Sequence, residues 1–319
     1  MEITPEIKEK LEKINAKYAA LGQDMGSYLD GLLYADTVKY WDYIAIDTLL
    51  SLQKPRTSFP DEVIFIVYHQ ITELYFKLAL REFEQVSEKE DLTAEFLVER
   101  TTRINRYFEA LTKSFEIMVQ GMEKEQFLKF RMSLLPASGF QSAQYRLIEI
   151  ASTDFINLVH KDVRSNFKGT EPIKEMYQNI YWKEGATELD SGKKTLTLEQ
   201  FEERYSDEFI SFGEKHINTN LWQCYKSLPQ VDQERDDVII ALKQNDVNVN
   251  INWPLVHYKS AVRYLHRAPD DIAATGGTNW QKYLPPRFQK RIFYPELWSE
   301  EEVNNWGKTW VEEVLGKQS

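Results

Sequence analysis

Residues Asp61 to about Ser87 read DEVIFIVYHQITELYFKLALREFEQVS, and their pattern indicates the architecture of the whole chain. Neither glycine nor proline interrupts this stretch, which favours one long helix. Asp61 and Glu62 stand in its first turn, where a carboxylate is stabilised by the partial positive charge of a helix N-terminus. Apolar residues lie nearly all round the helix, so we expect it in the protein core.

The rest of the chain continues the helical pattern. Glycine (13 residues) and proline (11 residues) are scarce, and no apolar–polar alternation lasts long enough to support a sheet. We therefore predict an all-α fold, a helix bundle, in a single domain over residues 1–319. Residues 161–196 are polar and without a clear period, which predicts a surface insertion with short helices. Further helices are predicted over Pro5 to about Leu21, Tyr40–Leu52, Leu92–Glu123 (one or two helices), Phe140 to about Val163, 235–244 and Trp253 to about His266. Two more are predicted from their start signals: one begins with a capping box at Thr197–Gln200, and one follows a cap at Ser299.

Charge and composition limit the classes of partner and compartment. The net charge of −11 argues against nucleic acid and anionic membrane as partners. Cys224 is the only cysteine, so neither an intrachain disulfide nor a multi-cysteine metal site is possible. The charged, amphipathic N-terminus is not a signal peptide, and the apolar run Val63–Tyr68 is too short to span a bilayer. We expect a cytoplasmic enzyme or binding protein.

A second stretch, Phe127 to Glu149, combines aromatic, cationic and amide side chains in FLKFRMSLLPASGFQSAQYRLIE. Phe127 and Arg131 are four residues apart, so they share one face of a helix. An aromatic ring beside a guanidinium suits a ligand with a flat apolar body and a carboxylate, which Arg can bind with two parallel hydrogen bonds. A buried arginine in a structural ion pair explains the same pattern.

Two of the five histidines stand in settings that favour a ligand. His69 follows Phe65 by one turn in an apolar helix, and a buried imidazole needs a hydrogen-bond partner from the protein or from a ligand. His257 is followed one turn later by Ser260 and Ala261, whose small side chains let a broad flat group approach. A histidine with such neighbours resembles an axial haem ligand, although an ordinary helix can carry the same residues.

Four blocks of the sequence, in order, resemble the tryptophan 2,3-dioxygenase family. They are YWDYIAIDTLL from Tyr40, DEVIFIVYHQITEL from Asp61, the stretch Phe127–Glu149, and the segment from Trp253 through Thr275-Gly276-Gly277 to Tyr294-Pro-Glu-Leu-Trp298. The resemblance covers about residues 40 to 298, and its third block is the longest and most specific.

The resemblance implies an all-helical dioxygenase fold around a buried haem pocket, with roles for particular residues. His257 would be the axial ligand of haem b, which is ferrous in the active form, and His69 would be a catalytic residue that binds the indole N–H. Arg131 would bind the substrate carboxylate, and Thr275 its amino-acid end. The other substrate-binding residues would be Phe65, Ile66, Val67, Tyr68 and Phe127, with Tyr40, Tyr43 and Ile44 reaching in from a neighbouring subunit.

The implied reaction cleaves the indole C2–C3 bond of L-tryptophan with O2 and gives N-formylkynurenine, the first step of the kynurenine route. The family forms homotetramers, dimers of dimers, in which the N-terminal segment, about residues 1–50, would exchange contacts between subunits.

Some residues depart from the family pattern. Pro254 stands where arginine usually follows Trp253, Ala274 replaces a glycine, and residues 278–280 differ from the usual S-S-G. Two alternatives therefore stay open: a related haem-dependent indole monooxygenase, and a haem or tryptophan sensor without turnover.

Overall fold

The computed structural model describes residues 3–134, 139–186, 193–265 and 286–308. The chain divides into two compact units, residues 1–53 and 54–319. Helices dominate both, and the described residues contain no strand; Val159 and Ile180 form an isolated bridge. The predicted all-α fold is therefore confirmed. The prediction of a single domain stays untested.

The N-terminal unit consists of four helices without a core of their own. They are α1 (Pro5–Ala19), α2 (Met25–Tyr34), α3 (Tyr40–Tyr43) and α4 (Ile46–Leu50), and none contains a buried residue. The single helix predicted over Tyr40–Leu52 is wrong. Ala45 has a φ of 48°, in the left-handed region, and this breaks the segment into α3 and α4.

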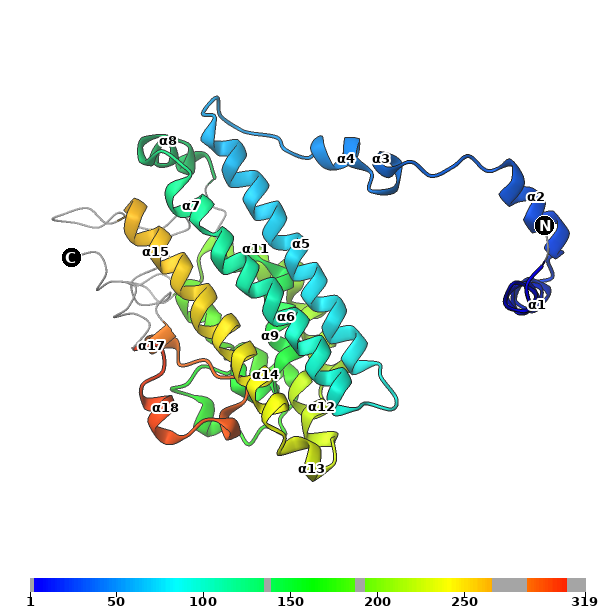
Figure 1. Ribbon diagram of the computed structural model, residues 1–319. Coiled ribbons are helices and arrows are strands. Elements are labelled where there is room, and N and C mark those ends of the chain that lie inside the picture. Colours follow the sequence, from blue (N-terminus) through cyan, green and yellow to red (C-terminus); the bar gives the residue numbers. More distant parts are fainter. Residues whose placement is uncertain (1–2, 135–138, 187–192, 266–285, 309–319) are drawn as a thin grey trace. The chain divides into compact units, whose positions relative to one another are not determined.

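The larger unit is built on the long helix α5 (Asp61–Ser87), which confirms the first prediction. Helix α5 packs against α6 (Ala94–Ser114) and α9 (Ala143–Ser152), as Figure 1 shows. Further helices complete the bundle: α7 (Glu116–Gln120), α8 (Lys124–Phe130), η1 (Arg131–Leu134), η2 (Gly139–Gln141), η3 (Phe155–Leu158), η4 (Arg164–Asn166), α10 (Ile173–Gln178), η5 (Tyr181–Ala186), α11 (Leu196–Lys215), α12 (Leu221–Ser227), α13 (Gln230–Gln233), α17 (Pro286–Gln289), η7 (Pro295–Leu297) and α18 (Glu300–Asn304).

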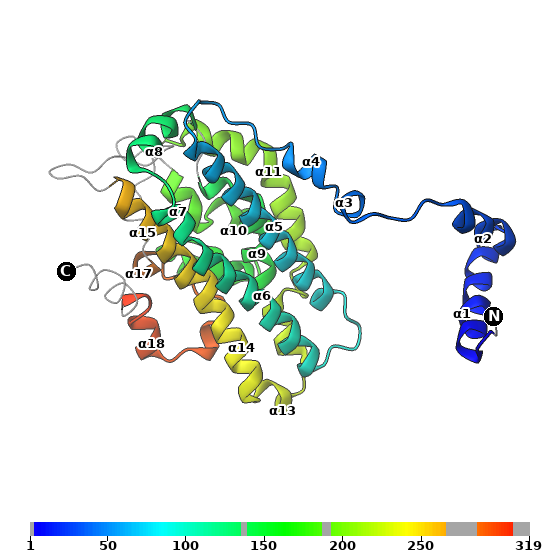
Figure 2. The same cartoon turned by 45° about the horizontal axis from the view of Figure 1, so that its top comes forward.

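One continuous rod runs along α6 and is formed by three segments. Helix α14 (Asp236–Val247) leads through the π-helical turn η6 (Asn248–Asn252) into α15 (Trp253–Leu265). Figure 2 shows α14 and α15 in line with each other, from a second direction. The helix predicted from Trp253 to about His266 is confirmed, since α15 spans Trp253–Leu265 with Pro254 in its first turn.

Two predicted helix boundaries and one predicted surface segment differ from the structure. Helix α9 ends at Ser152 and not near Val163, because Thr153 is extended and its hydroxyl donates to the Phe293 carbonyl. The cap of α11 is Thr195, whose hydroxyl accepts from the Leu198 N–H, and not Thr197. The surface insertion at 161–196 is wrong in its middle, where Trp182 is fully buried. Ser299 does cap α18, in a capping box with Glu302.

Helix α5 is only partly covered by the rest of its unit. An apolar stripe with the spacing of a helical face stays open along it, formed by the exposed residues Val63, Ile71, Leu74 and Leu78 and half-buried Val67. By length and composition α5 could also cross a membrane, since an 18-residue window has a mean hydropathy of 1.3 with 22% of it buried. The expectation that this region is too short to span a bilayer was based on Val63–Tyr68 alone and did not consider the whole helix.

Candidate functional site

The fold brings together residues that lie far apart in the sequence. Helix α5 carries Phe65 and His69, helix α8 carries Phe127, and helix α15 carries His257. Arg131 begins η1 directly after α8. The two imidazoles are close enough for His69 to help lower the pKa of His257. The structure thus joins predicted residues from three of the four sequence blocks.

Aromatic rings connect the members of this site. The Phe65 ring lies 4.1 Å from the His69 ring and 6.2 Å from the Phe127 ring, measured between centroids. Phe127 in turn packs against Tyr264 of α15, at 4.6 Å. Flat apolar surfaces on three helices therefore face one region, which suits a planar apolar ligand.

His257 has the chemistry of a metal-binding imidazole. Its Nδ1–H donates to the Trp253 carbonyl at 2.9 Å, so the lone pair is on Nε2. Burial lowers the pKa of His257 to about 4, which keeps the ring neutral. Half-buried Ser260 and Ala261 follow one turn later and leave room beside it. These residues fit a haem held through Nε2.

His69 is a second neutral imidazole, and one of its ring nitrogens can accept a hydrogen bond. Its Nδ1–H donates to the Phe65 carbonyl at 2.7 Å, so Nε2 can accept a hydrogen bond. Desolvation by the surrounding protein atoms lowers the pKa of His69, although the residue as a whole is exposed. The Nδ1 bond alone is not diagnostic, because His216 donates to Phe212 in the same way.

Arg131 is 4% exposed, at the junction of α8 and η1. Burial lowers the pKa of Arg131, but a guanidinium stays charged at any physiological pH. A buried cation one turn from Phe127 is positioned for a carboxylate on a ligand that stacks against that ring.

The structure gives no direct support for the other predicted site residues. Tyr68 is buried and its hydroxyl donates to the Leu111 carbonyl, so it belongs to the α5–α6 contact. Val67 is on the open stripe of α5, about 200° around the helix from Phe65, and Ile66 is half-buried. Thr275 lies outside the described residues. Tyr40, Tyr43 and Ile44 are exposed in the N-terminal unit. All seven assignments stay predictions.

The sequence did not reveal the residues that pack around His257. Its ring is 4.5 Å from the Phe115 ring and 4.4 Å from the Trp253 ring. Tyr264 fixes α15 against α7 by donating to the Met118 carbonyl at 2.8 Å. Trp253 is four residues before His257 and Tyr264 is seven residues after it, so both lie on the same face of α15. This helical spacing could have indicated them.

In the described residues the fold is all-α, and its helices bring two imidazoles, several aromatic rings and a buried arginine into one part of the bundle. Comparison with known proteins identifies the family. The model of the tryptophan 2,3-dioxygenase family matches residues 32–241, about two thirds of the chain. The chain belongs to the tryptophan 2,3-dioxygenase family, a family of oxidoreductases.

Two individual relatives align with most of this sequence, and a third aligns with a shorter part of it. A tryptophan 2,3-dioxygenase of Bacillus thuringiensis subsp. konkukian is 29% identical over 83% of this chain and 92% of its own length. One from Pseudomonas fluorescens is 27% identical over 83% and 91%. One from a Ruegeria species is 40% identical over a shorter part, 36% of this chain and 42% of that protein. His257 lies beyond the family-model match, so its role depends on the geometry described above.

Proposed function

We propose that this protein is a haem-dependent dioxygenase that cleaves the indole C2–C3 bond of L-tryptophan with O2 and forms N-formylkynurenine. The observation that carries the proposal is the pair of imidazoles, His69 on α5 and His257 on α15, each packed against an aromatic ring and close enough for His69 to affect the pKa of His257. Family membership supports the substrate and the reaction.

Each described residue has a physical task in this proposal. His257 would hold haem b through Nε2, and the ferrous haem supplies the dioxygen chemistry when it is bound. The Nε2 atom of His69 would accept the indole N–H, while Phe65 and Phe127 flank the ring. Arg131 would bind the carboxylate, so analogues without that group would lose a charge-assisted hydrogen bond. Thr275 would contact the amino-acid end.

The function is tested by the mass of the product. The haem-loaded protein is reduced without oxygen, mixed with tryptophan and then given ¹⁸O2. Two labelled oxygen atoms in a ring-opened product support the proposal. One labelled atom supports the indole monooxygenase, and tight tryptophan binding without O2 consumption supports the sensor, so either result overturns it.

We expect replacement of His69 by alanine to weaken tryptophan binding by about 2- to 10-fold, because one neutral hydrogen bond is lost. Haem content should not change. The measurement is a tryptophan titration of the ferrous protein, followed by absorbance. Methylation of the indole nitrogen removes the same bond from the ligand, so N1-methyltryptophan should bind wild type and variant alike. A full loss of affinity for both ligands would contradict this role.

We also propose that the protein is cytoplasmic and a homotetramer, a dimer of dimers, in which the segment of about residues 1–50 contacts a neighbouring subunit. Helices α1 to α4 bury no residue of their own, and Tyr40 and Tyr43 are 71% and 80% exposed. The open stripe of α5 offers a second apolar surface. Apolar areas of this kind are typical of obligate interfaces. The single, buried Cys224 suits a reducing compartment.

We expect a charge in the stripe to lower the oligomeric state. Leu74 is 49% exposed, so Leu74→Glu leaves the fold of the single chain intact, but it places an unpaired charge in an apolar interface. Light scattering after gel filtration should show a smaller assembly. Val231→Glu is the control, since Val231 is 73% exposed and off the stripe. A tetramer for both variants would exclude the α5 stripe as an interface.

A further inference from the structure

The π turn η6 ends five residues before His257 and determines which way that residue faces. A π turn contains one residue more than an α turn, and π turns inside helices are frequent at functional sites. Each residue of a helix rotates the following side chains by about 100°. If Asn248–Asn252 relaxed to a regular α-helix, α15 would turn by that angle, and the His257 ring would leave the region of Phe65 and Phe127.

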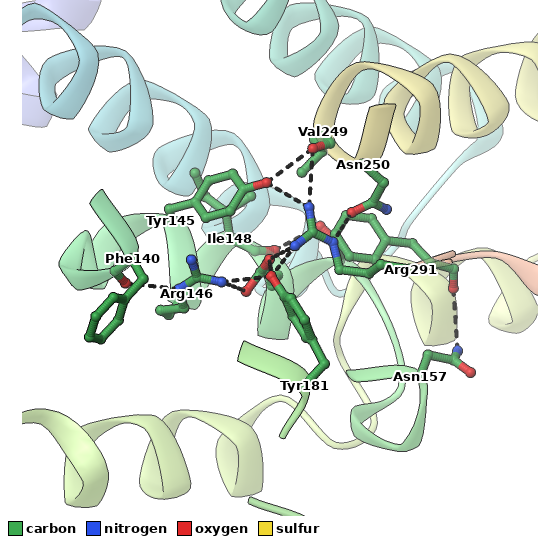
Figure 3. Close-up of polar contacts among 12 residues, drawn as sticks. Phe140, Tyr145, Arg146, Ile148, Asn157, Tyr181, Val249, Asn250 and Arg291 are labelled. Carbon is green, nitrogen blue, oxygen red and sulfur yellow. Dashed lines mark hydrogen bonds and ion pairs between the residues drawn. The ribbon is translucent and has the colours of Figure 1, made fainter. Parts of the chain in front are cut away.

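Side chains from outside the rod hold the π turn in place (Figure 3). The Tyr145 hydroxyl donates to the Val249 carbonyl at 3.0 Å, and Arg291 donates to the same carbonyl at 3.3 Å. Arg291 also donates through Nε to the amide oxygen of Asn250 and through a terminal nitrogen to the Tyr145 hydroxyl, at 2.7 Å. Tyr145 and Arg291 thus both bond the Val249 carbonyl within the π turn, and Arg291 also bonds the side chain of Asn250.

The same turn is bonded from its N-terminal side. The Asn250 amide donates to Asp246 at 2.6 Å, and Asp246 also accepts the backbone N–H groups of Phe293 and Tyr294. The indole of Trp298 donates to that carboxylate at 3.0 Å. The segment from Arg291 to Trp298 therefore contacts the rod both before the π turn and within it.

Buried charges make this contact rigid. Arg291 pairs with Glu149 at 2.6 Å, and Glu149 also pairs with Arg146 at 2.7 Å. Arg146, Glu149, Asp246 and Arg291 are all nine-tenths or more buried, with two charges of each sign. Moving one of these groups leaves an uncompensated buried charge, which is strongly unfavourable. These buried charges therefore restrict the conformation of the π turn η6.

We propose that Tyr145, Arg291 and Asn250 are positioning residues: they fix the register of α15 and so orient the His257 imidazole. They act through the π turn and do not touch the ligand. The inference rests on the proposed role of His257 as the haem ligand. The competing explanation is that this network contributes only to the stability of the fold.

The test compares two tyrosines that differ in what their hydroxyls hold. Tyr145→Phe removes the bond to Val249 and keeps the ring that packs 5.5 Å from Phe76. Tyr177→Phe is the control, because Tyr177 is equally buried and its hydroxyl bonds Ser206 at 3.0 Å, on α10 and α11, away from the rod. Both changes delete one buried hydroxyl, so we expect similar decreases in the melting temperature.

Only Tyr145→Phe is expected to change the site. The iron–histidine stretching band of the ferrous protein, measured by resonance Raman at equal haem content, should shift or split. In the haem-free protein, amides of residues 248–257 should exchange hydrogen faster than in Tyr177→Phe. An unchanged band and unchanged exchange in Tyr145→Phe would overturn the inference while leaving the proposed function intact. Absence of the band from the wild-type protein would instead reject His257 as the ligand.

Discussion

Replacement of His257 by alanine is expected to abolish stable haem binding and to lower tryptophan turnover by more than about 100-fold. Loss of a group that only supports a metal ligand lowers affinity or activity about 10- to 100-fold, and loss of the ligand itself has a larger effect. The neutral ring, with its Nδ1–H bonded to Trp253, leaves Nε2 as the atom that binds. The Soret absorbance per protein chain measures the effect.

A second histidine provides the control for this experiment. His216 is 6% exposed and donates through Nδ1 to the Phe212 carbonyl, as His257 donates to Trp253. His216→Ala removes a buried imidazole at the C-terminal end of α11 and should leave the Soret absorbance unchanged. Equal loss of haem in both variants would mean that the effect arises from unfolding and would refute the special role of His257.

Replacement of Arg131 by methionine is expected to raise the KM for tryptophan by about 30- to 1000-fold, with haem content unchanged. Removing one partner of a buried charge pair costs about 2–5 kcal/mol, and about 1.4 kcal/mol corresponds to a factor of ten. Methionine keeps the length and apolar character of the side chain, so this buried position stays filled. Steady-state kinetics with a haem determination on each preparation give the comparison.

The ligand supplies the control in this case. Tryptamine lacks the carboxylate of tryptophan, so the preference of the wild type for tryptophan over tryptamine should nearly disappear in Arg131→Met. Arg131→Lys keeps the charge but not the planar pair of donors, and it should recover only part of the affinity. If the variant still prefers tryptophan to tryptamine as strongly as wild type, Arg131 does not bind the carboxylate.

The helical architecture was predictable because local pattern and tertiary burial agree over the long helices. The 27 residues of α5 and the capping box at Ser299 are cases where the sequence carries its own boundary signals. Boundaries that depend on distant residues were not predictable. Helix α9 ends where Thr153 bonds Phe293, which is 140 positions away, and Ala45 adopts a left-handed conformation that alanine does not favour.

Buried aromatic residues explain the error in the segment 161–196. Its polar composition indicated a surface, but Met176, Tyr177 and Trp182 are buried against the core. Lys183 stands beside them, with its ammonium group 3.8 Å from the Tyr177 ring centroid and 2.7 Å from Glu202. A cation–π contact and a buried ion pair thus place charged side chains inside, where composition alone predicts solvent.

Some residues of the candidate site could likewise be predicted from the sequence, and others could not. Phe65 with His69 and Phe127 with Arg131 could be predicted because each pair lies one turn apart on its own helix. The surroundings of His257 could not, since Phe115 reaches it from another helix and the π turn has no sequence signal. Tyr145 and Glu149, at the end of the second sequence stretch, bond Arg291 and the Val249 carbonyl and so support the π turn.

The contacts of Arg291–Trp298 with the rod have a consequence for the order of folding. Asp246, Val249 and Asn250 obtain these partners from a segment that leaves the ribosome after His257 has been synthesised. A nascent chain that ends before Arg291 can form α5, α6 and α9, but it lacks the groups that bond the π turn. The π turn beside His257 therefore becomes fully bonded only after Arg291–Trp298 has been synthesised, and chains truncated before Arg291 should be helical but bind haem poorly.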